Sequence, residues 1–169
     1  MSDRLNEISV LDLNDSAFRL IAKDWFLLTA GPLTKFNTMT ASWGGFGELW
    51  MKKVAFVFVR PPRFTYDFME SNESFSLSFF EEKYRPTLKL CGTKSGRDID
   101  KMTGLDITPT EETKGIVHFK EAKLVLECRK LYIHDLKPEN FLDPIIHDSY
   151  PDKDYHRMYI GEITRCLTS

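Results

Sequence analysis

The sequence predicts a mainly β protein, folded as a closed or nearly closed antiparallel barrel with a few short helices. At least six segments have the alternating or the β-branched and aromatic composition of strands. No long helical patterns alternate with them, so a doubly wound parallel sheet is disfavoured. Aromatic residues make up 13% of the chain, which suits pleated, half-buried surfaces. Closure into a barrel would remove exposed sheet edges.

Four strands are expected in the first half of the chain, after a polar and irregular start that extends to about Lys23. They cover residues 25–29, 36–43, 53–60 and 74–80. The segment 53–60 is a continuous apolar run and is predicted to be buried on both faces. The glycines at 44, 45 and 47 are expected to end the second strand, and Pro61 and Pro62 end the third.

Short helices are expected between the strands. Thr65 can cap a helix that runs to Asn72, and Pro86 can open a second one that ends at Gly92. Ser95, with an acidic residue three positions later, is expected to begin a third helix. Further strands are predicted at residues 116–119, 122–135 and 155–166.

Length and charge narrow the classes of function. A chain of 169 residues predicts one domain, spanning residues 1–169. Lys and Arg total 23 against 25 Asp and Glu, a formal net charge of −2, so a broad nucleic-acid surface is not expected. No apolar run approaches the roughly 20 residues of a membrane helix. We therefore expect no nucleic-acid partner and no membrane partner.

The cysteines and the first residues of the chain indicate in which cellular compartment the protein is expected. Cys91, Cys128 and Cys166 are widely spaced and odd in number, which is not a disulfide framework. Residues 1–7 show no basic region followed by an apolar stretch, so no secretory signal is visible. These observations predict a reducing, cytoplasmic location.

The strand at 36–43 is the first candidate for chemistry. Thr38, Thr40 and Ser42 share one of its faces. Small hydroxyl side chains let a flat ligand approach the backbone and offer hydrogen bonds at its edge. An ordinary outward face of a strand would have the same composition, and on the pattern alone this is the commoner interpretation.

The segment 91–98 is the second candidate. Lys94 and Arg97 flank the expected helix start at Ser95, and a helix N-terminus with nearby cations suits a phosphate group. The order of residues in a P-loop is absent. A solvated helix cap with surface charges is the alternative, and the pattern alone leaves both open.

The remaining motifs are weaker. Arg60 and Arg63 follow a buried strand and could reach an anion at a barrel mouth, although charges at strand ends are usually just surface residues. The four histidines have no zinc spacing, so no metal site is expected. His156, at the start of the last strand, would alone be an ordinary partly buried histidine. Neither a nucleophile elbow nor a Rossmann fingerprint is present.

Together, these segments resemble the flavin reductase-like, FMN-binding split-barrel family, the group that includes flavoredoxin. No single motif decides the resemblance, but the order and spacing of the motifs from about residue 29 to 162 are specific. The matching stretches are 37–44 (NTMTASWG), 57–65 (VFVRPPRFT), 75–80 (FSLSFF), 91–98 (CGTKSGRD), 127–129 (ECR), 138–141 (PENF) and 154–162 (DYHRMYIGE).

The resemblance implies a six-stranded antiparallel split β-barrel, a homodimer, and one FMN per subunit near the dimer interface. It implies an FMN-dependent oxidoreductase that passes electrons from NADH, NADPH or a redox protein partner through FMN to an acceptor. An FMN-binding electron carrier that does not oxidise NAD(P)H directly is the alternative. A non-enzymatic binding module for haem or flavin is a third hypothesis. The resemblance does not indicate the acceptor.

The resemblance also implies which residues contact the cofactor. Thr40, Ala41, Ser42 and Trp43 would line the isoalloxazine ring. Arg60, Lys94, Ser95 and Arg97 would surround the phosphate and the ring edge. Ser78, Phe79 and Phe80 would wall the pocket. His156, from this subunit or the second, would approach the ring. The expected set is completed by Asn37, Met39, Cys91 and Asp98. The flavin itself carries the redox chemistry, so no catalytic residue is expected beyond it, with His156 as the one candidate.

Overall fold

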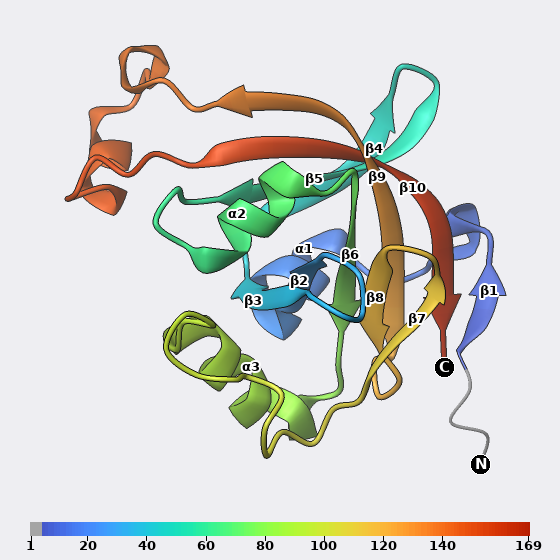
Figure 1. Ribbon diagram of the computed structural model, residues 1–169. Helices are drawn as coiled ribbons and strands as arrows, with labels where there is room; N and C mark the ends of the chain where they lie inside the picture. The colour runs from blue at the N-terminus through green and yellow to red at the C-terminus, as the bar shows by residue number, and fades with distance from the viewer. Residues whose placement is uncertain (1–4) are drawn as a thin grey trace.

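One eight-stranded antiparallel sheet curves around a hydrophobic core and forms the body of the molecule (Figure 1). The computed structural model describes residues 5–169. Strands pair in the order β3-β2-β6-β9-β10-β5-β4, and β1 pairs with β10. These strands are β1 (Asn6–Ile8), β2 (Phe26–Ala30), β3 (Asn37–Ala41), β4 (Gly44–Leu49), β5 (Lys52–Val59), β6 (Ser74–Phe79), β9 (Leu124–Asp135) and β10 (Arg157–Thr168). The predicted mainly β, antiparallel fold is confirmed.

The core lies inside this curved sheet and is lined by six strands, β2, β3, β5, β6, β9 and β10. The side chains of β2 show how the core forms, because successive side chains along a strand point to opposite faces of the sheet. Phe26 and Leu28 enter the barrel core, whereas Leu27 faces outward into a second cluster beneath α3. β3 and β4 are the two ends of the strand path, and only Ser42 and Trp43 connect them.

The helices are short. α2 (Phe64–Ser71) and α3 (Arg85–Thr93) both pack against β3, and α1 (Ala17–Arg19) continues into a π-helical turn, η2 (Leu20–Asp24). The 3-10 turns are η1 (Val10–Asp12), η3 (Glu82–Tyr84), η4 (Pro138–Asn140) and η5 (Pro144–Ser149). Within residues 5–169, no helix is long and apolar enough to cross a bilayer.

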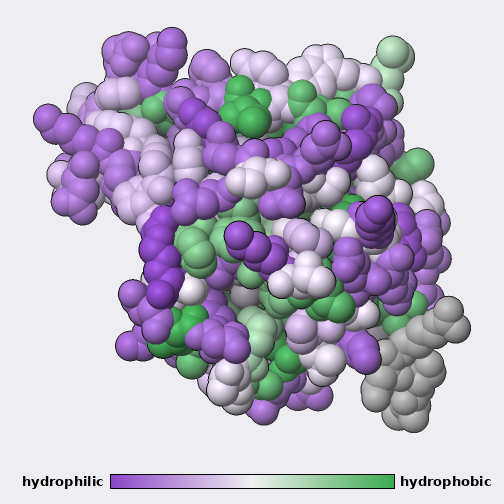
Figure 2. Space-filling view, viewed as in Figure 1, coloured by the Kyte–Doolittle hydropathy of each residue, from purple (hydrophilic) through white to green (hydrophobic). Residues whose placement is uncertain are grey.

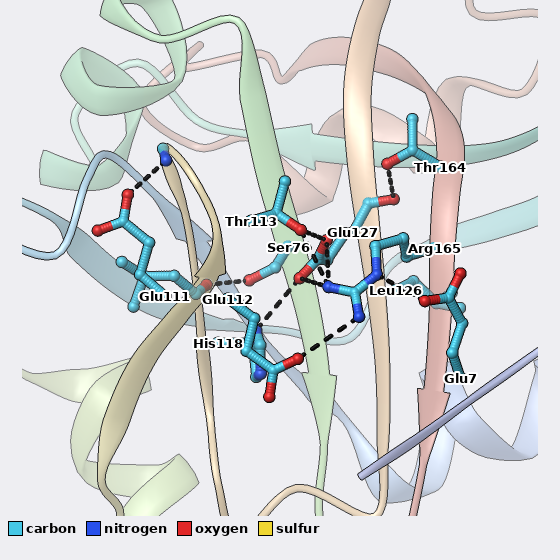
Figure 3. Close-up of polar contacts among 12 residues, drawn as sticks. Glu7, Ser76, Glu111, Glu112, Thr113, His118, Leu126, Glu127, Thr164 and Arg165 are labelled. Atoms are coloured by element: carbon cyan, nitrogen blue, oxygen red, sulfur yellow. Dashed lines mark hydrogen bonds and ion pairs between the residues drawn. The ribbon is translucent and has the colours of Figure 1, made fainter.

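A hairpin of β7 (Pro109–Thr113) and β8 (Ile116–Phe119) covers a buried polar cluster on the outer face of the sheet (Figure 3). His118 and Glu127 are both fully buried, and the imidazole Nδ1 lies 3.3 Å from the carboxylate. Thr113 and Arg165 also donate hydrogen bonds to Glu127. We call these four residues the hairpin cluster.

β9 and β10 are each 12 residues long, and their paired ends project beyond the barrel as an arm (Figures 1 and 2). Residues 136–156 join the two strands at the tip. Aromatic side chains hold this connection together: the rings of Tyr150 and Tyr155 are 4.6 Å apart, and Phe141 stacks on Tyr155 at 5.7 Å. The connection returns to the barrel at His156.

The glycine segment after β3 ends that strand, as predicted, but it also forms a strand that was not predicted. β3 ends at Ala41, and Gly44, Gly45 and Gly47 belong to β4, which pairs antiparallel with β5. Backbone pairing needs no side chain, and at Gly44 a Cβ atom would lie 2.6 Å from the carbonyl oxygen of Phe56. Glycine therefore permits this close pairing.

The helix expected at Ser95 is absent, and this segment forms a turn instead. The Ser95 hydroxyl accepts the N–H of Arg97, and its carbonyl accepts those of Asp98 and Ile99. Ser side chains compete with helix formation through such local bonds. Thr65 is not a cap either, because α2 begins one residue earlier, at Phe64.

The start of the chain is more ordered than expected. Residues 5–23 contain β1, η1, α1 and most of the π-helical turn, and Leu20 and Ile21 are buried in the barrel core. A Ser9 cap on η1 and a Ser16 cap on α1 explain how so polar a sequence forms turns. The expectation for residues 1–4 lies outside the described residues.

Candidate functional site

A pocket of about 230 Å³ opens at the corner between β3 and β4. We call it the aromatic pocket. It is built from the end of β3 and its connection to β4, the end of β5, the residue before α2, and the residue before β10. Its lining residues are Met39, Thr40, Ala41, Ser42, Trp43, Phe58, Arg60, Arg63 and His156. All of these except Phe58 are among the residues that the sequence singles out.

Two rings and one backbone edge define this pocket. The centroids of the Trp43 and His156 rings are 5.0 Å apart, and Phe58 meets His156 edge-on at 6.4 Å. β3 is an end strand that pairs only with β2 among the strands of the described chain. Its other edge therefore offers backbone N–H and C=O groups to a ligand, except at Thr38, whose carbonyl accepts a hydrogen bond from Lys101.

His156 is a neutral base held in place by Tyr150. Its side chain is buried, and Nδ1 lies 2.8 Å from the Tyr150 hydroxyl. Burial, assisted by the charges of Arg60 and Arg63, lowers the pKa of His156 to about 4, although Asp154 acts in the opposite direction. Near neutral pH, the imidazole can therefore hold one proton at one nitrogen and accept at the other.

We expect the His156 ring to titrate far below the ordinary histidine value of 6.5, with a midpoint near pH 4. A pH series of two-dimensional NMR spectra checks this, with the resonance assigned by its loss in His156→Gln. Because the pKa is lowered, the ring should show no protonation between pH 6 and 8. A midpoint at pH 6 to 7 would show that the ring is solvated and does not lie in the pocket wall.

Arg60 is tied to the arm. Its Nη1 donates to both carboxylate oxygens of Asp154 at 3.1 Å, and its Nη2 donates to the carbonyl of Ser149 at 2.8 Å. The guanidinium also lies over the Tyr150 ring, 5.0 Å from its centroid. Its charge is therefore largely compensated, and it fixes the segment that carries Tyr150 and His156.

A second pocket, of about 190 Å³, adjoins the first at Arg63. We call it the cationic pocket. Its lining residues are Asn37, Pro62, Arg63, Phe64, Thr65, Gly92, Thr93, Lys94, Ser95 and Lys101. The first turn of α2 faces it, and no side chain caps that helix. The N–H of Tyr66 already donates to the carbonyl of Arg63 at 2.9 Å, so those of Phe64 and Thr65 are the first-turn groups that could meet an anion.

Of the less exposed cations of this pocket, Arg63 was considered from sequence only as an anion contact at a strand end, and Lys101 was not singled out. Arg63 is half-buried, and burial, with Arg60 beside it, lowers its pKa. Lys101 is 6% exposed, and burial lowers its pKa to about 8. The sequence around Lys101 is polar, so only the position of its side chain in the fold distinguishes it from a surface lysine.

The structure brings most of the expected site residues into the two pockets, but not all of them. Those that line a pocket are Asn37, Met39, Thr40, Ala41, Ser42, Trp43, Arg60, Lys94, Ser95 and His156. Arg97 instead bonds Asp67 at 2.8 Å and lies over the Phe64 ring, and Asp98 is exposed.

The expected wall of Ser78, Phe79 and Phe80 is not part of either pocket lining. β6 lies in the middle of the sheet, so its alternate side chains enter the barrel core or pack on the outer face. Phe79 lies in the core, and Phe80 lies with Cys91 in the outer cluster. All four side chains are at most 3% exposed.

The model of the flavin reductase-like domain family matches residues 18–169. The chain belongs to this family. Among curated protein sequences, none matches the chain. Solved structures of the same fold are known at low sequence identity.

Three of these structures illustrate the likeness of this flavin reductase-like chain. Flavoredoxin from Methanosarcina acetivorans is 24% identical, with a TM-score of 0.66 over 86% of this chain and 68% of that chain. Flavoredoxin of Desulfovibrio vulgaris (Miyazaki F) is 19% identical, with a TM-score of 0.67 over 96% and 76%. The styrene monooxygenase flavin reductase from Pseudomonas putida S12 is 15% identical, with a TM-score of 0.62 over 86% and 79%. At these identities, the likeness establishes the fold.

Proposed function

We propose that this flavin reductase-like protein binds FMN across the aromatic and cationic pockets and passes electrons from NADH, NADPH or a protein donor to an acceptor. The observation that carries the proposal is the junction of the two pockets at Arg63. FMN joins a flat ring to an anionic phosphate, so it needs a slot with backbone donors at one end and cations at the other.

The residues present fit this cofactor. The open edge of β3 and the Ser42 hydroxyl would bind the ring edge, and Trp43 would cover part of the ring. The first turn of α2 and the cations of the second pocket would hold the phosphate. Bound FMN would supply hydride and single-electron transfer. The protein's part is to bind and orient the ring and to keep His156 neutral beside it.

Adding FMN to the purified protein should give a yellow complex that survives gel filtration at about one equivalent per chain. Flavin fluorescence should be quenched, because Trp43 and His156 border the aromatic pocket. Ser42→Trp, which fills the pocket mouth, should abolish the quenching, and Phe18→Ala, at a side chain that is 88% exposed, should not alter it. A protein that remains colourless and leaves the fluorescence of FMN unchanged would rule the proposal out.

Anaerobic mixing of the FMN complex with NADH and with NADPH separates the two modes of action. Bleaching of the flavin band at catalytic rates supports an NAD(P)H-dependent reductase. Bleaching by dithionite alone supports an electron carrier that receives electrons from another protein.

We also propose a homodimer in the cytoplasm. Apolar side chains exposed on the arm support an interface between subunits, among them Leu142 at 97% and Ile145 at 67% exposure. The three cysteines are free and buried, which is compatible with a reducing compartment. Light scattering coupled to gel filtration would give the oligomeric state.

A further inference from the structure

The floor of the cationic pocket is a buried ammonium group. The Nζ atom of Lys101 donates to the carbonyl of Thr38 at 2.7 Å and to that of Cys91 at 3.1 Å. An ammonium has three donors, so these two bonds leave one N–H. Neither carbonyl carries a formal charge, and a buried charge is costly unless a charge of opposite sign lies near it.

The charged groups around Lys101 do not supply that opposite charge. From α3, the Cys91 thiol is kept neutral because burial raises its pKa. From the N-cap of α2, Arg63 adds a second positive charge. The preceding residue, Asp100, directs its carboxylate to the backbone N–H of Met102 and to a nearby hydroxyl. Within residues 5–169, no salt bridge neutralises either Lys101 or Arg63.

The cations expected from sequence are poorer candidates. Lys94 is exposed, and a solvated lysine contributes little to binding. The guanidinium of Arg97 is engaged with Asp67 and with the carbonyl of Pro62. By contrast, Lys101 is held in one position by two hydrogen bonds and is shielded from water, so its interaction with an anion is stronger.

We propose that Lys101, together with Arg63 and the first turn of α2, forms the binding site for a phosphate dianion, and that Lys101 is the principal cation for the flavin phosphate. This inference rests on the proposed function, in which FMN is the ligand. The principal phosphate contact is then the buried Lys101, and not the surface residues Lys94 and Arg97 that the resemblance implied.

The site also predicts how affinity depends on pH. Lys101 binds an anion only when protonated, and burial lowers its pKa to about 8 in the free protein. A bound phosphate favours the charged form and raises that pKa. The affinity for FMN should therefore fall as pH rises above about 8, whereas the affinity for riboflavin, which lacks the phosphate, should stay constant.

Fluorescence titrations with FMN and with riboflavin test the inference. The wild-type protein should bind FMN more tightly than riboflavin. Lys101→Met should weaken FMN binding by about 10- to 100-fold, the range expected for a hydrogen bond to a charged group. It should leave riboflavin binding within about twofold, which also shows that the pocket is folded. Lys89→Met, at an exposed lysine of α3 that lines neither pocket, is the matched control and should leave FMN binding unchanged, whereas Lys94→Met should weaken it by less than about threefold.

The outcomes separate this inference from the proposed function. If the wild-type protein binds neither flavin, the proposed function is wrong. If Lys101→Met keeps its preference for FMN over riboflavin, while Lys94→Met or Arg97→Met loses it, the function stands and the role of Lys101 is overturned. If Lys101→Met does not fold, the ratio of the two affinities in the wild-type protein between pH 7 and 9.5 decides: a falling ratio supports the role, and a constant ratio contradicts it.

Discussion

Replacing Glu127 with alanine should lower the free energy of unfolding by about 2–4 kcal/mol, because it leaves buried polar neighbours without an acceptor and opens a cavity beneath the hairpin. Its carboxylate is fully buried, accepts a hydrogen bond from Thr113 and lies 3.3 Å from Arg165 and from His118. Without it, the buried His118 ring would lose the carboxylate that lies 3.3 Å from its Nδ1. Urea unfolding followed by circular dichroism measures the change.

The control is Glu112→Ala. Its side chain is 46% exposed and lies 3.4 Å from the same arginine, Arg165, so the expected loss is below about 1 kcal/mol. Equal losses for the two variants would show that burial of the hairpin cluster adds nothing to stability.

The contribution of Glu127 should also depend on pH. Burial acts to raise its pKa, but the neighbouring His118 ring, the hydrogen bond from Thr113 and the charge of Arg165 outweigh burial and hold the pKa below its ordinary value of 4.5. A carboxyl with a lowered pKa stabilises the folded state above the unfolded value and loses that effect as pH falls through the folded value. The difference in stability between wild type and Glu127→Gln should therefore be constant near neutral pH and shrink below pH 4.5.

Phe79→Ala should cost about 3–5 kcal/mol of unfolding free energy, the usual cost of truncating a core phenylalanine. The Phe79 ring is fully buried in the barrel core, 5.3 Å from the ring of Phe26 and 6.1 Å from that of Phe46. Its removal would leave a cavity that neighbouring strands cannot close. Thermal and urea unfolding would report the loss.

Phe18→Ala is the matched control, because that side chain is 88% exposed and its truncation should change stability by less than about 0.5 kcal/mol. The same Phe79 variant tests the role expected from sequence. If Phe79 only packs the core, FMN affinity in the folded fraction should be unchanged. A large loss of FMN affinity without a loss of stability would restore Phe79 to the flavin site.

Most strands could be predicted because alternation and β-branched composition are local signals. β4 could not, since its glycines carry no side-chain pattern and its pairing depends on β5. The turn at Ser95 was mistaken for a helix because the same Ser hydroxyl serves both structures.

The part of the site that is contiguous along one strand could be predicted, whereas the part that depends on tertiary packing could not. Residues 39–43 are contiguous and line one pocket, as the family resemblance implied, although the pattern alone favoured an ordinary outward face. The positions of Phe79 and Lys101, by contrast, could not be predicted from the sequence. A phenylalanine in an alternating strand can face a ligand or the core, and a lysine in a polar segment is expected on the surface. Only the placement of β6 and of the chain after α3 decides which side chain reaches the pocket.

The two-residue corner at Ser42 and Trp43 has a mechanical consequence. β3 and β4 terminate the strand path, so the seam of the barrel runs between them. The two-residue link joins the two edges covalently at one end of this seam, beside the residues 39–43 that line the aromatic pocket. Under the proposed function, a molecule seated there would stabilise the folded barrel, because it binds the folded chain and not the unfolded one. The resistance of the barrel to unfolding should therefore rise with the concentration of that molecule.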